Sequence, residues 1–368
     1  MRLAALSLLY SCLCYAGYSY VASVSIPAPT SGPHVNFTVA IKGTDLKMAT
    51  VANGGKVQNT ITRVGMTVPA DLVVSTDAAA NSLISWGFEK YVPTTGELII
   101  WAKISSYSAS TTLYVSVGNA AVSTYQGGAQ GSEFDSYTGL VVHLPDGTTL
   151  SGKDFSANST DFTPTGITAT TGIVDGAASD SGSGSNNLVT SPVTISTTPM
   201  VMTFSAWVYL STPMVSRYTI FTTTPNNTAN NWSVEFNGLN GVTLNSMNVI
   251  APGSFIVATP ANSVTNGQWY HVAFSRNGTG QTFTLYLNGV SQTPTYLSVV
   301  DFIDSGQTKA IGNRGTSGQQ WVGTIDEVVY SKTVRSAGWI ATMYANQSSP
   351  PTIGVFSPVG AGSQSIVF

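Results

Sequence analysis

Acidic side chains are scarce in this sequence, and their spacing bears on whether the chain could hydrolyse a glycosidic bond. The 368 residues include 17 Asp and Glu in total. A glycoside hydrolase needs two carboxyl groups about 5–10 Å apart, flanking the scissile bond. Glu133 and Asp135 lie close together, but no third acid follows them, and Asp326 and Glu327 are adjacent, so on a regular strand they point to opposite faces. We therefore predict that the protein is not an enzyme.

Histidine and cysteine show no spacing typical of a metal or nucleophile site. His34, His143 and His271 are isolated from one another in the sequence. Cys12 and Cys14 are two residues apart, which is too close for an ordinary disulfide. The glycines lie at turns between strand-like runs and not in a phosphate-binding loop. Thiolate, nucleophilic and nucleotide chemistry are therefore not predicted.

Oxygen-bearing side chains suggest one ion. Calcium prefers carboxylate, carbonyl and amide oxygens, and Asp154, Asn158 and Asp326 supply such oxygens. Asp and Asn are also the usual residues of turns and caps. Calcium is therefore the one cofactor that the sequence suggests, with purely structural turns as the alternative.

Tryptophans beside amides suggest a glycan site. Sugars bind to exposed aromatic faces that are flanked by amide and carboxylate groups. Trp232 follows Asn231 at the end of an Asn-rich stretch, and Trp321 follows two glutamines. Each Trp also begins or precedes a predicted strand, so packing in the core is the competing interpretation. Trp232, Trp321 and Asn231 are the predicted ligand-binding residues.

The elements that must position these residues are short strands joined by turns. Residues 269–274 and 283–287 alternate between apolar and polar positions and are rich in aromatic and branched side chains, which predicts two strands of a hairpin. Asn277-Gly278 between them and Asn288-Gly289 after them supply the positive φ of tight turns. One helix is predicted over Ser336–Tyr344, with Ser336 as its N-cap. The predicted fold class is all-β, with two tandem β-sandwiches and one short C-terminal helix.

The first sandwich resembles a domain family of unknown function that often precedes laminin-G-like modules in secreted bacterial and viral proteins. The resemblance is carried by residues 17–20, by 95–98 before the strand 101–104, and by the closing strand 113–119. It covers most of this part of the chain and implies no activity.

The second sandwich resembles a laminin-G-like module of the concanavalin A-like jelly-roll superfamily. Five segments match in order, namely 140–146, 154–158, 204–208, the hairpin 269–289 and 323–328. The resemblance implies a jelly roll that often binds calcium near its loops. His143 departs from the aromatic residue that is usual at its position.

Composition places the boundaries and limits the partners. Charged residues make up only 8% of the chain, against roughly 25% in a typical soluble protein. The formal net charge of −3 provides no basic surface for nucleic acid. The predicted segments are a signal peptide (1–16), a first β-sandwich (17–125), a Gly-rich linker (126–136), a laminin-G-like domain (137–348) and a C-terminal tail (349–368).

The first 16 residues resemble a secretory signal peptide. They contain one basic residue, a short apolar run and Ala16 at a plausible cleavage point. The run is too short to span a bilayer, so no membrane span is predicted in the mature chain. An apolar N-terminal strand is the alternative. The predicted location is secreted, at the cell surface or on a virion exterior.

Two functions fit these features. The first is non-catalytic adhesion or recognition of a glycan or surface-protein ligand through the laminin-G-like domain. The second is a structural subunit of a filament, surface layer or viral particle, which self-assembles through its sandwiches and termini. Low charge and many strand edges suit the second, and exposed faces at Trp232 and Trp321 would favour the first.

Overall fold

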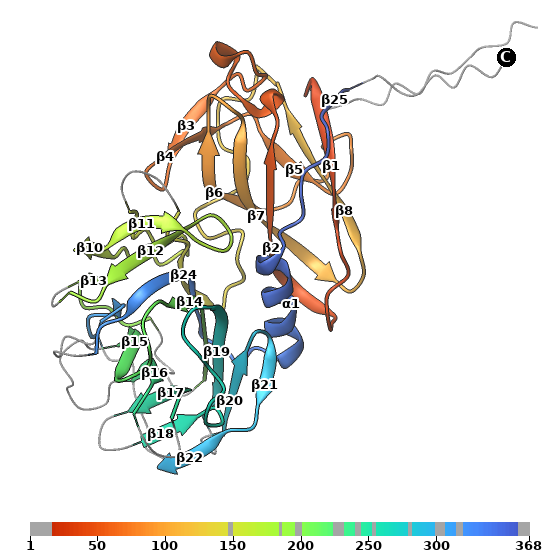
Figure 1. Cartoon of the computed structure of the whole chain (residues 1–368). Helices are drawn as coiled ribbons and strands as arrows, with labels where there is room; N and C mark the ends of the chain where they lie inside the picture. The colour runs from red at the N-terminus through yellow and green to blue at the C-terminus, as the bar shows by residue number, and fades with distance from the viewer. Residues whose placement is uncertain are drawn as a thin grey trace, which may run out of the picture.

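The computed structural model describes the chain as two β-sandwiches joined by a helix (Figure 1). The described residues are 17–145, 150–183, 186–195, 201–223, 232–239, 244–251, 255–278, 282–298, 306–313 and 319–359. Residues 1–16, the predicted signal peptide, lie outside them. In these described ranges, no helix is both long and apolar enough to cross a membrane.

The first sandwich is built from two sheets and a hairpin. Its strands are β1 (Tyr20–Ile26), β2 (His34–Thr44), β3 (Thr60–Arg63), β4 (Met66–Pro69), β5 (Val73–Ser75), β6 (Trp86–Val92), β7 (Glu97–Tyr107), β8 (Thr111–Val117) and β25 (Ser357–Pro358). One sheet has the order β25-β1-β8-β5 and the other β2-β7-β6, while β3 pairs with β4. Two 3₁₀ turns, Leu46–Met48 and Val51–Asn53, follow β2. Alternating apolar residues of β1, β2, β7 and β8 fill the space between the sheets.

The second sandwich has two larger sheets. Its strands are β9 (Thr138–Val142), β10 (Thr163–Thr165), β11 (Thr168–Thr171), β12 (Gly176–Ser181), β13 (Asn187–Val189), β14 (Met202–Leu210), β15 (Arg217–Thr222), β16 (Ser233–Asn237), β17 (Ser246–Ala251), β18 (Phe255–Ala258), β19 (Trp269–Asn277), β20 (Thr282–Leu287), β21 (Val290–Gln292), β22 (Thr295–Ser298), β23 (Ala310–Ile311) and β24 (Val322–Ser331). One sheet has the order β10-β13-β23-β15-β16-β17-β18-β22. The other has the order β11-β12-β24-β14-β19-β20-β21, with β9 paired to β24.

The predicted hairpin lies in the second of these sheets, between β14 and β21. In β19 and β20, Val272 pairs with Leu287 and Asn277 with Thr282. The turn to β21 consists of Asn288 and Gly289, both with positive φ (50° and 76°), as a two-residue turn of this kind requires. The all-β fold with tandem sandwiches is confirmed.

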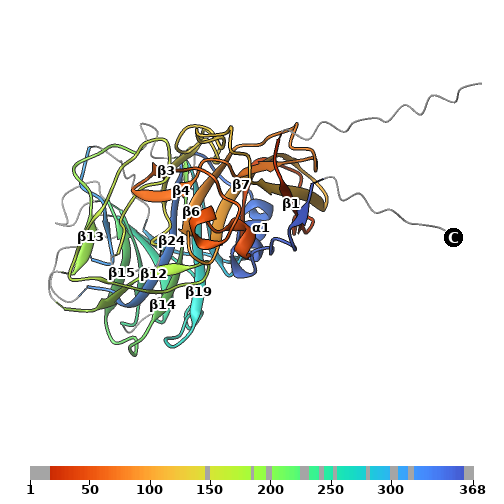
Figure 2. The same cartoon turned by 90° about the horizontal axis from the view of Figure 1, so that it is seen from above.

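One helix, α1 (Ala337–Ser348), lies between the sandwiches (Figures 1 and 2). Its N-cap is Ser336, as predicted, and the Ser336 side chain accepts a hydrogen bond from the Trp339 N–H. The helix continues past the predicted end at Tyr344. Gly338, which weakens the helix on propensity grounds, is needed here because a Cβ at this position would come within 2.9 Å of the Ser31 carbonyl oxygen.

Helix α1 is bonded to both sandwiches. The Asn346 side chain accepts from the Ala40 N–H (2.7 Å) and donates to the Ala40 carbonyl (3.1 Å), so it pairs with β2 as a neighbouring strand would. On the other side, Trp207 Nε1 of β14 donates to Gln347 Oε1 (2.8 Å). The helix therefore fixes the two sandwiches to each other.

The described part of the tail returns to the first sandwich. Ile353 N donates to the Lys42 carbonyl of β2 (2.9 Å), and Gly354 N donates to the Ser23 carbonyl of β1 (2.8 Å). The side chains of Ile353 and Phe356 are part of the first core. Residues from beyond the second sandwich thus cover the edge where the two sheets of the first one lie open.

The predicted linker is packed against the first sandwich. Glu133 is buried, and its carbonyl accepts a hydrogen bond from Thr38 Oγ1 of β2 (2.5 Å). Lys103 of β7 donates to the carbonyls of Ser132 and Phe134. The segment marks the boundary between the sandwiches, but it is not a flexible spacer, because its polar groups are bonded to β2 and β7.

Candidate binding site between the two sandwiches

The predicted glycan-binding tryptophans lie in the core of the second sandwich. Trp232 is 1% exposed and Trp321 is 0% exposed. The Trp232 ring packs against Phe204, Phe221 and Phe274 at centroid distances of 5.2–6.0 Å. Both rings are therefore core residues, and the expectation that they offer an exposed face for a sugar is wrong. Each Trp lies immediately before a strand, β16 or β24, and its side chain is part of the core. Asn231 lies outside the described residues.

The predicted calcium residues Asp154 and Asn158 form a turn held by hydrogen bonds. Asp154 Oδ1 accepts from the N–H groups of Val141 (3.0 Å) and Ser156 (2.8 Å), and Oδ2 accepts from Ser156 Oγ (2.8 Å) and the Thr160 N–H (2.8 Å). Asn158 Nδ2 donates to the Gly139 carbonyl (2.7 Å). With the carboxylate lone pairs already used, this loop does not fit a calcium ion. Calcium binding at Asp326, the third predicted residue, stays a prediction.

Asp326 and Glu327 lie at a β-bulge. The pairing of β24 with β14 shifts between Ser205 and Trp207, and Glu327 has a positive φ of 49°. The bulge interrupts the alternation of side chains. Ile325 and Val328, on either side of the pair, both lie in the core of the second sandwich, so both acids point away from that core. The expectation that they point to opposite faces is therefore wrong, because it assumed a regular strand.

A cluster of Glu89, His143 and Glu327 lies at the junction of the sandwiches. His143 Nδ1 is 3.0 Å from each carboxylate oxygen of Glu327 and 3.8 Å from Glu89 Oε2. Trp101 Nε1 donates to Glu89 Oε2 (2.7 Å), and the Trp101 ring stacks on the imidazole at 4.6 Å. All three cluster side chains are buried. Among the described residues, they are the group of three or more whose atoms could hold a metal ion.

Burial dominates the protonation of this cluster. Loss of solvation, together with the charges of Glu327, Asp326 and Asp175, raises the pKa of Glu89 well above its usual value. Burial also raises the pKa of Glu327 and of Asp326. For His143, burial lowers the pKa to about 3, so the imidazole is neutral at pH 7. Two neighbouring acids and a neutral imidazole therefore share a site that has little positive charge of its own.

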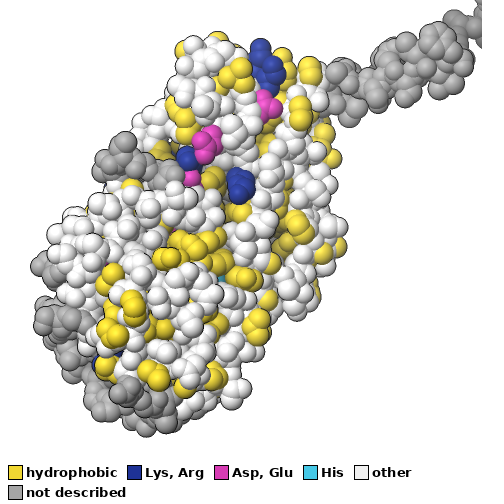
Figure 3. Space-filling model, viewed as in Figure 1, with side chains coloured by type: hydrophobic (Ala, Val, Ile, Leu, Met, Phe, Trp, Pro, Cys, Tyr) yellow, Lys and Arg dark blue, Asp and Glu magenta, His cyan; other side chains and the backbone are white. Residues whose placement is uncertain are grey.

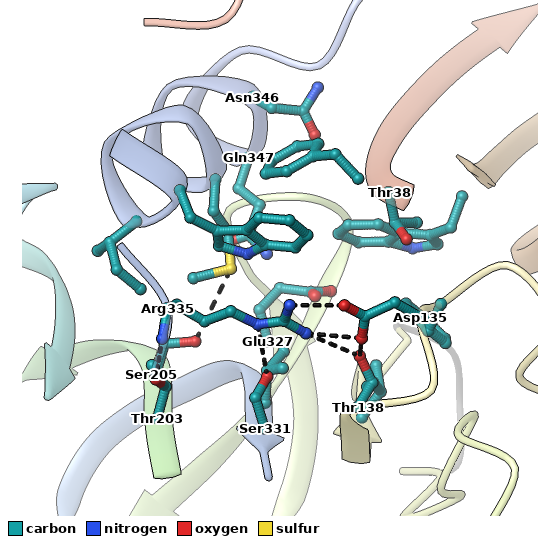
Figure 4. A pocket seen from close by; sticks show the side chains of 18 of the residues that line it. Thr38, Asp135, Thr138, Thr203, Ser205, Glu327, Ser331, Arg335, Asn346 and Gln347 are labelled. Atoms are coloured by element: carbon teal, nitrogen blue, oxygen red, sulfur yellow. Dashed lines mark hydrogen bonds and ion pairs between the residues drawn. The ribbon is translucent and has the colours of Figure 1, made fainter. Parts of the chain in front are cut away.

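A small inner pocket adjoins the cluster (Figure 4). His143 and Glu327 line it, together with Trp101, Phe134 and Met343. The pocket has a volume of ≈ 50 Å³, which accommodates a few water molecules but not a sugar ring. It is too small to be a substrate site.

An ion pair stands at the mouth of the inner pocket. Arg335 donates to both oxygens of Asp135, at 2.6 and 2.7 Å, as Figure 4 shows. The guanidinium also lies 4.1 Å above the centre of the Trp339 ring. Burial tends to raise the pKa of Asp135, but the bonds to Arg335 outweigh it and the net pKa is lowered. Asp135, Arg335, Trp339 and Asn36 line both the inner pocket and an outer groove.

The outer groove is an open hollow between the sandwiches. Its volume is ≈ 370 Å³, within the range of about 300–1,000 Å³ that is usual for small-molecule sites. Three exposed apolar side chains line it: Val35, Tyr137 and Val334. Tyr137 is 53% exposed and is the only aromatic among the exposed large apolar side chains of the described residues. The groove thus combines an exposed ring with fixed polar groups.

Another open groove at the junction has a charged lining. Lys90 of β6 pairs with Asp175 of the second sandwich (2.7 Å) and with Glu97 (2.9 Å). On the face seen in Figure 3, few charged side chains are visible, and they lie mainly over the first sandwich and its junction with the second. This groove is therefore lined by one ion pair within the first sandwich and one between the sandwiches.

Residues 180–341 match the family described as the concanavalin A-like lectin/glucanases superfamily (Laminin_G_3). The second sandwich is a concanavalin A-like module. A search of curated protein sequences gives no match.

Three solved structures are similar to this chain at low sequence identity. Domain 4 of AbnA, an extracellular arabinanase of Geobacillus stearothermophilus solved with arabinotriose, is 16% identical over 56% of this chain and 98% of its own, with a TM-score of 0.43. The binding domain of botulinum neurotoxin serotype D is 12% identical over 60% and 53% of the two chains (TM-score 0.40). A Trypanosoma rangeli sialidase solved with the inhibitor DANA is 12% identical over 64% and 40% (TM-score 0.42). The chain thus spans about half or less of the toxin domain and the sialidase.

The concanavalin A-like module supplies His143 and Glu327, and the first sandwich supplies Glu89 and Trp101. His143 looks isolated in the sequence because its partners Glu89 and Glu327 lie 54 and 184 positions away (143 − 89 and 327 − 143). The pairing of Val142 with Val328 places His143 beside Glu327. The contact with Glu327 follows from the pairing of β9 with β24, and the contact with Glu89 follows from the packing of the two sandwiches. No local sequence pattern encodes either. Tyr137 and Arg335, which flank the module at its two ends, were missed for the same reason.

Proposed function

We propose that this protein is a non-catalytic recognition protein that binds a glycan in the outer groove between the sandwiches. The observation that carries the proposal is the gathering of exposed apolar side chains there, with Tyr137 as the exposed ring. Pyranose rings present apolar C–H faces, and an exposed aromatic side chain in a hollow is suited to them.

The polar groups of the groove are suited to the hydroxyl groups of a sugar. Arg335 and Asp135 are largely buried and hold each other in place, so this wall of the groove has a fixed geometry. Asn36 adds an amide at the same wall. Fixed donors and acceptors bind hydroxyl groups without a large loss of side-chain entropy. A glycan is therefore the ligand class that this lining favours.

The arrangement of carboxylates supports a non-catalytic role. A glycosidase needs its scissile bond between two carboxyl groups. Glu89 and Glu327 lie close together, but the His143 imidazole lies within 3.8 Å of both and leaves no room for a substrate there. Asp135, in the predicted linker, is held by Arg335. We accordingly propose binding without hydrolysis.

The test is a glycan array with the full chain, followed by calorimetric titration of the best ligand. Tyr137→Ala is expected to weaken binding about tenfold or more while the fold is kept, because it removes the exposed ring. Leu46→Ala is the matched control, since Leu46 is also 53% exposed but lies outside the groove. Failure of the wild-type protein to bind any glycan, or unchanged affinity in Tyr137→Ala, contradicts the proposal.

We also propose that the protein acts outside the cell, at a cell surface or on a virion exterior. This rests on the signal-like composition of residues 1–16. Fusion of these residues to a reporter enzyme without a signal is expected to direct the reporter out of a bacterial cytoplasm. Retention of the reporter inside the cell would argue against an extracellular role.

Self-assembly through the termini is the less favoured function. Ser357 and Pro358 of the tail already pair with Val21 and Tyr20 of the same chain. Light scattering of the full chain is the direct check, and large regular oligomers would make assembly the primary function.

A further inference from the structure

We propose that Glu89, His143 and Glu327 form a binding site for a divalent transition-metal ion of the Zn²⁺ type, which joins the two sandwiches. The site draws Glu89 from β6 of the first sandwich, Glu327 from β24 and His143 from the segment after β9. One ligand atom from each residue lies within 4.8 Å of the other two. The proposal is independent of the glycan-binding groove.

The distances fit ligands that share one ion. A zinc ion binds imidazole nitrogen and carboxylate oxygen at about 2.0–2.2 Å, so two ligands on one ion lie roughly 3–4 Å apart. His143 Nδ1 lies 3.0 Å from Glu327 Oε1 and 3.8 Å from Glu89 Oε2. Both oxygens of Glu327 are 3.0 Å from Nδ1, so the open edge of this carboxylate faces the nitrogen. A bound ion would lie between this carboxylate and Nδ1 and would replace the hydrogen bond between them.

A second observation is an acceptor that lacks a partner. Glu89 is fully buried, and its Oε1 has no hydrogen-bond partner within the described protein. A buried carboxylate oxygen without a partner carries a large free-energy cost. Trp101 donates to Oε2, which is the oxygen 3.8 Å from His143 Nδ1, and Oε1 has no hydrogen-bond partner among the described residues, so this carboxylate keeps lone pairs for a metal ion.

The charges near the cluster also favour a cation. Asp326 is buried beside Glu327, and its Oδ1 likewise lacks a partner. Lys90, the cation that pairs with nearby Asp175 and with Glu97, lines the charged groove at the junction. A divalent ion would balance the charge of two of these buried carboxylates.

The donor set selects the type of ion. One imidazole nitrogen with two carboxylates suits zinc and similar transition ions, whereas calcium prefers six or more oxygens. The inner pocket lies beside His143 and Glu327 and has room for water as a further ligand. Because the ligands come from both sandwiches, a bound ion would stabilise the junction itself.

The experiment measures zinc binding by the full chain after removal of metals with a chelator. Calorimetric titration with Zn²⁺ is expected to show one ion per chain, and Co²⁺ in its place is expected to give visible absorption bands. Glu89→Gln and His143→Asn are expected to lower Zn²⁺ affinity about 100-fold or more. Zn²⁺ is also expected to raise the melting temperature of the wild-type protein but not of Glu89→Gln.

Glu133→Gln is the matched control, because Glu133 is a buried glutamate of the same junction that is not in the cluster. It should bind Zn²⁺ as the wild type does. If the cluster variants fail to fold, the ¹⁵N chemical shifts of the three histidines in the wild type provide the test. Zn²⁺ should change the shift of Nδ1 of His143 and of neither of the other two histidine Nδ1 atoms. Absence of stoichiometric binding by the wild type, equal affinity in Glu89→Gln, or a shift at another histidine overturns the proposal.

Discussion

The two sandwiches differ in how their cores are closed. The second sandwich is closed by strands that lie between residues 138 and 331, in one continuous stretch of chain. The first needs β25 and the residues before it, which follow helix α1. Its open edge is covered by Ile353 and Phe356.

This difference shows that a sequence boundary need not be a folding boundary. Residues 126–136 separate the sandwiches along the chain, yet the first sandwich is a discontinuous unit that includes the tail. The concanavalin A-like module, by contrast, should retain its own core if the tail is lost. Three changes test this asymmetry.

Truncation before Pro350 should have the largest effect. It removes Ile353 and Phe356 from the first core and the backbone bonds to Lys42 and Ser23. Burial of two large apolar side chains contributes about 1.5–3 kcal/mol each, so a loss on the order of 5 kcal/mol is expected. Hydrogen exchange should rise in β1 and β2 and stay low in β14 and β19.

Truncation after Val359 is the control, because it keeps every described contact of the tail. Equal protection of β1 in both truncated proteins would show that the tail does not complete the first sandwich.

Trp321→Ala should have a slightly smaller effect, confined to the second sandwich. The residue is fully buried against Phe236, so its loss should leave a cavity that costs about 3–5 kcal/mol. Urea unfolding measured separately with probes in each sandwich is the check. Tyr137→Ala is the control and should change the free energy of unfolding by less than about 0.5 kcal/mol. An equally small change in Trp321→Ala would contradict the burial of Trp321 in the core.

Glu133 should make the junction sensitive to pH. Burial raises its pKa from 4.5 to about 7 in the folded protein. Between these two pH values the folded state keeps a proton that the unfolded state has lost. The free energy of unfolding should therefore fall by about 3 kcal/mol in all as the pH rises from 4.5 to 7. The free energy of unfolding at several pH values, compared between wild type and Glu133→Gln, measures this contribution. If both proteins show the same pH dependence, Glu133 is not the cause.

Regular patterns made the fold predictable, and departures from regularity hid the site. The strands 269–274 and 283–287, the Asn288-Gly289 turn and the Ser336 cap are local features, and the structure has each of them. The bulge at Glu327 breaks the alternation on which the argument against a joint role of Asp326 and Glu327 rested.

The predicted binding residues failed for a related reason. An aromatic residue beside amides has the same composition whether its strand turns it inward or outward, so Trp232 could not be placed from its neighbours. The junction cluster depends on contacts between β6, β9 and β24, which are far apart in the sequence. No local pattern reports such contacts.

The pairing of Tyr20 with Pro358 places the two ends of the described chain side by side on the first sandwich. A pulling force applied through both ends would therefore peel β25 from β1, one backbone bond after another, before it strained any other part. The concanavalin A-like module and the groove would lie outside the line of that force. If the protein is anchored at either end, the second sandwich therefore bears no part of the force that passes between the two ends.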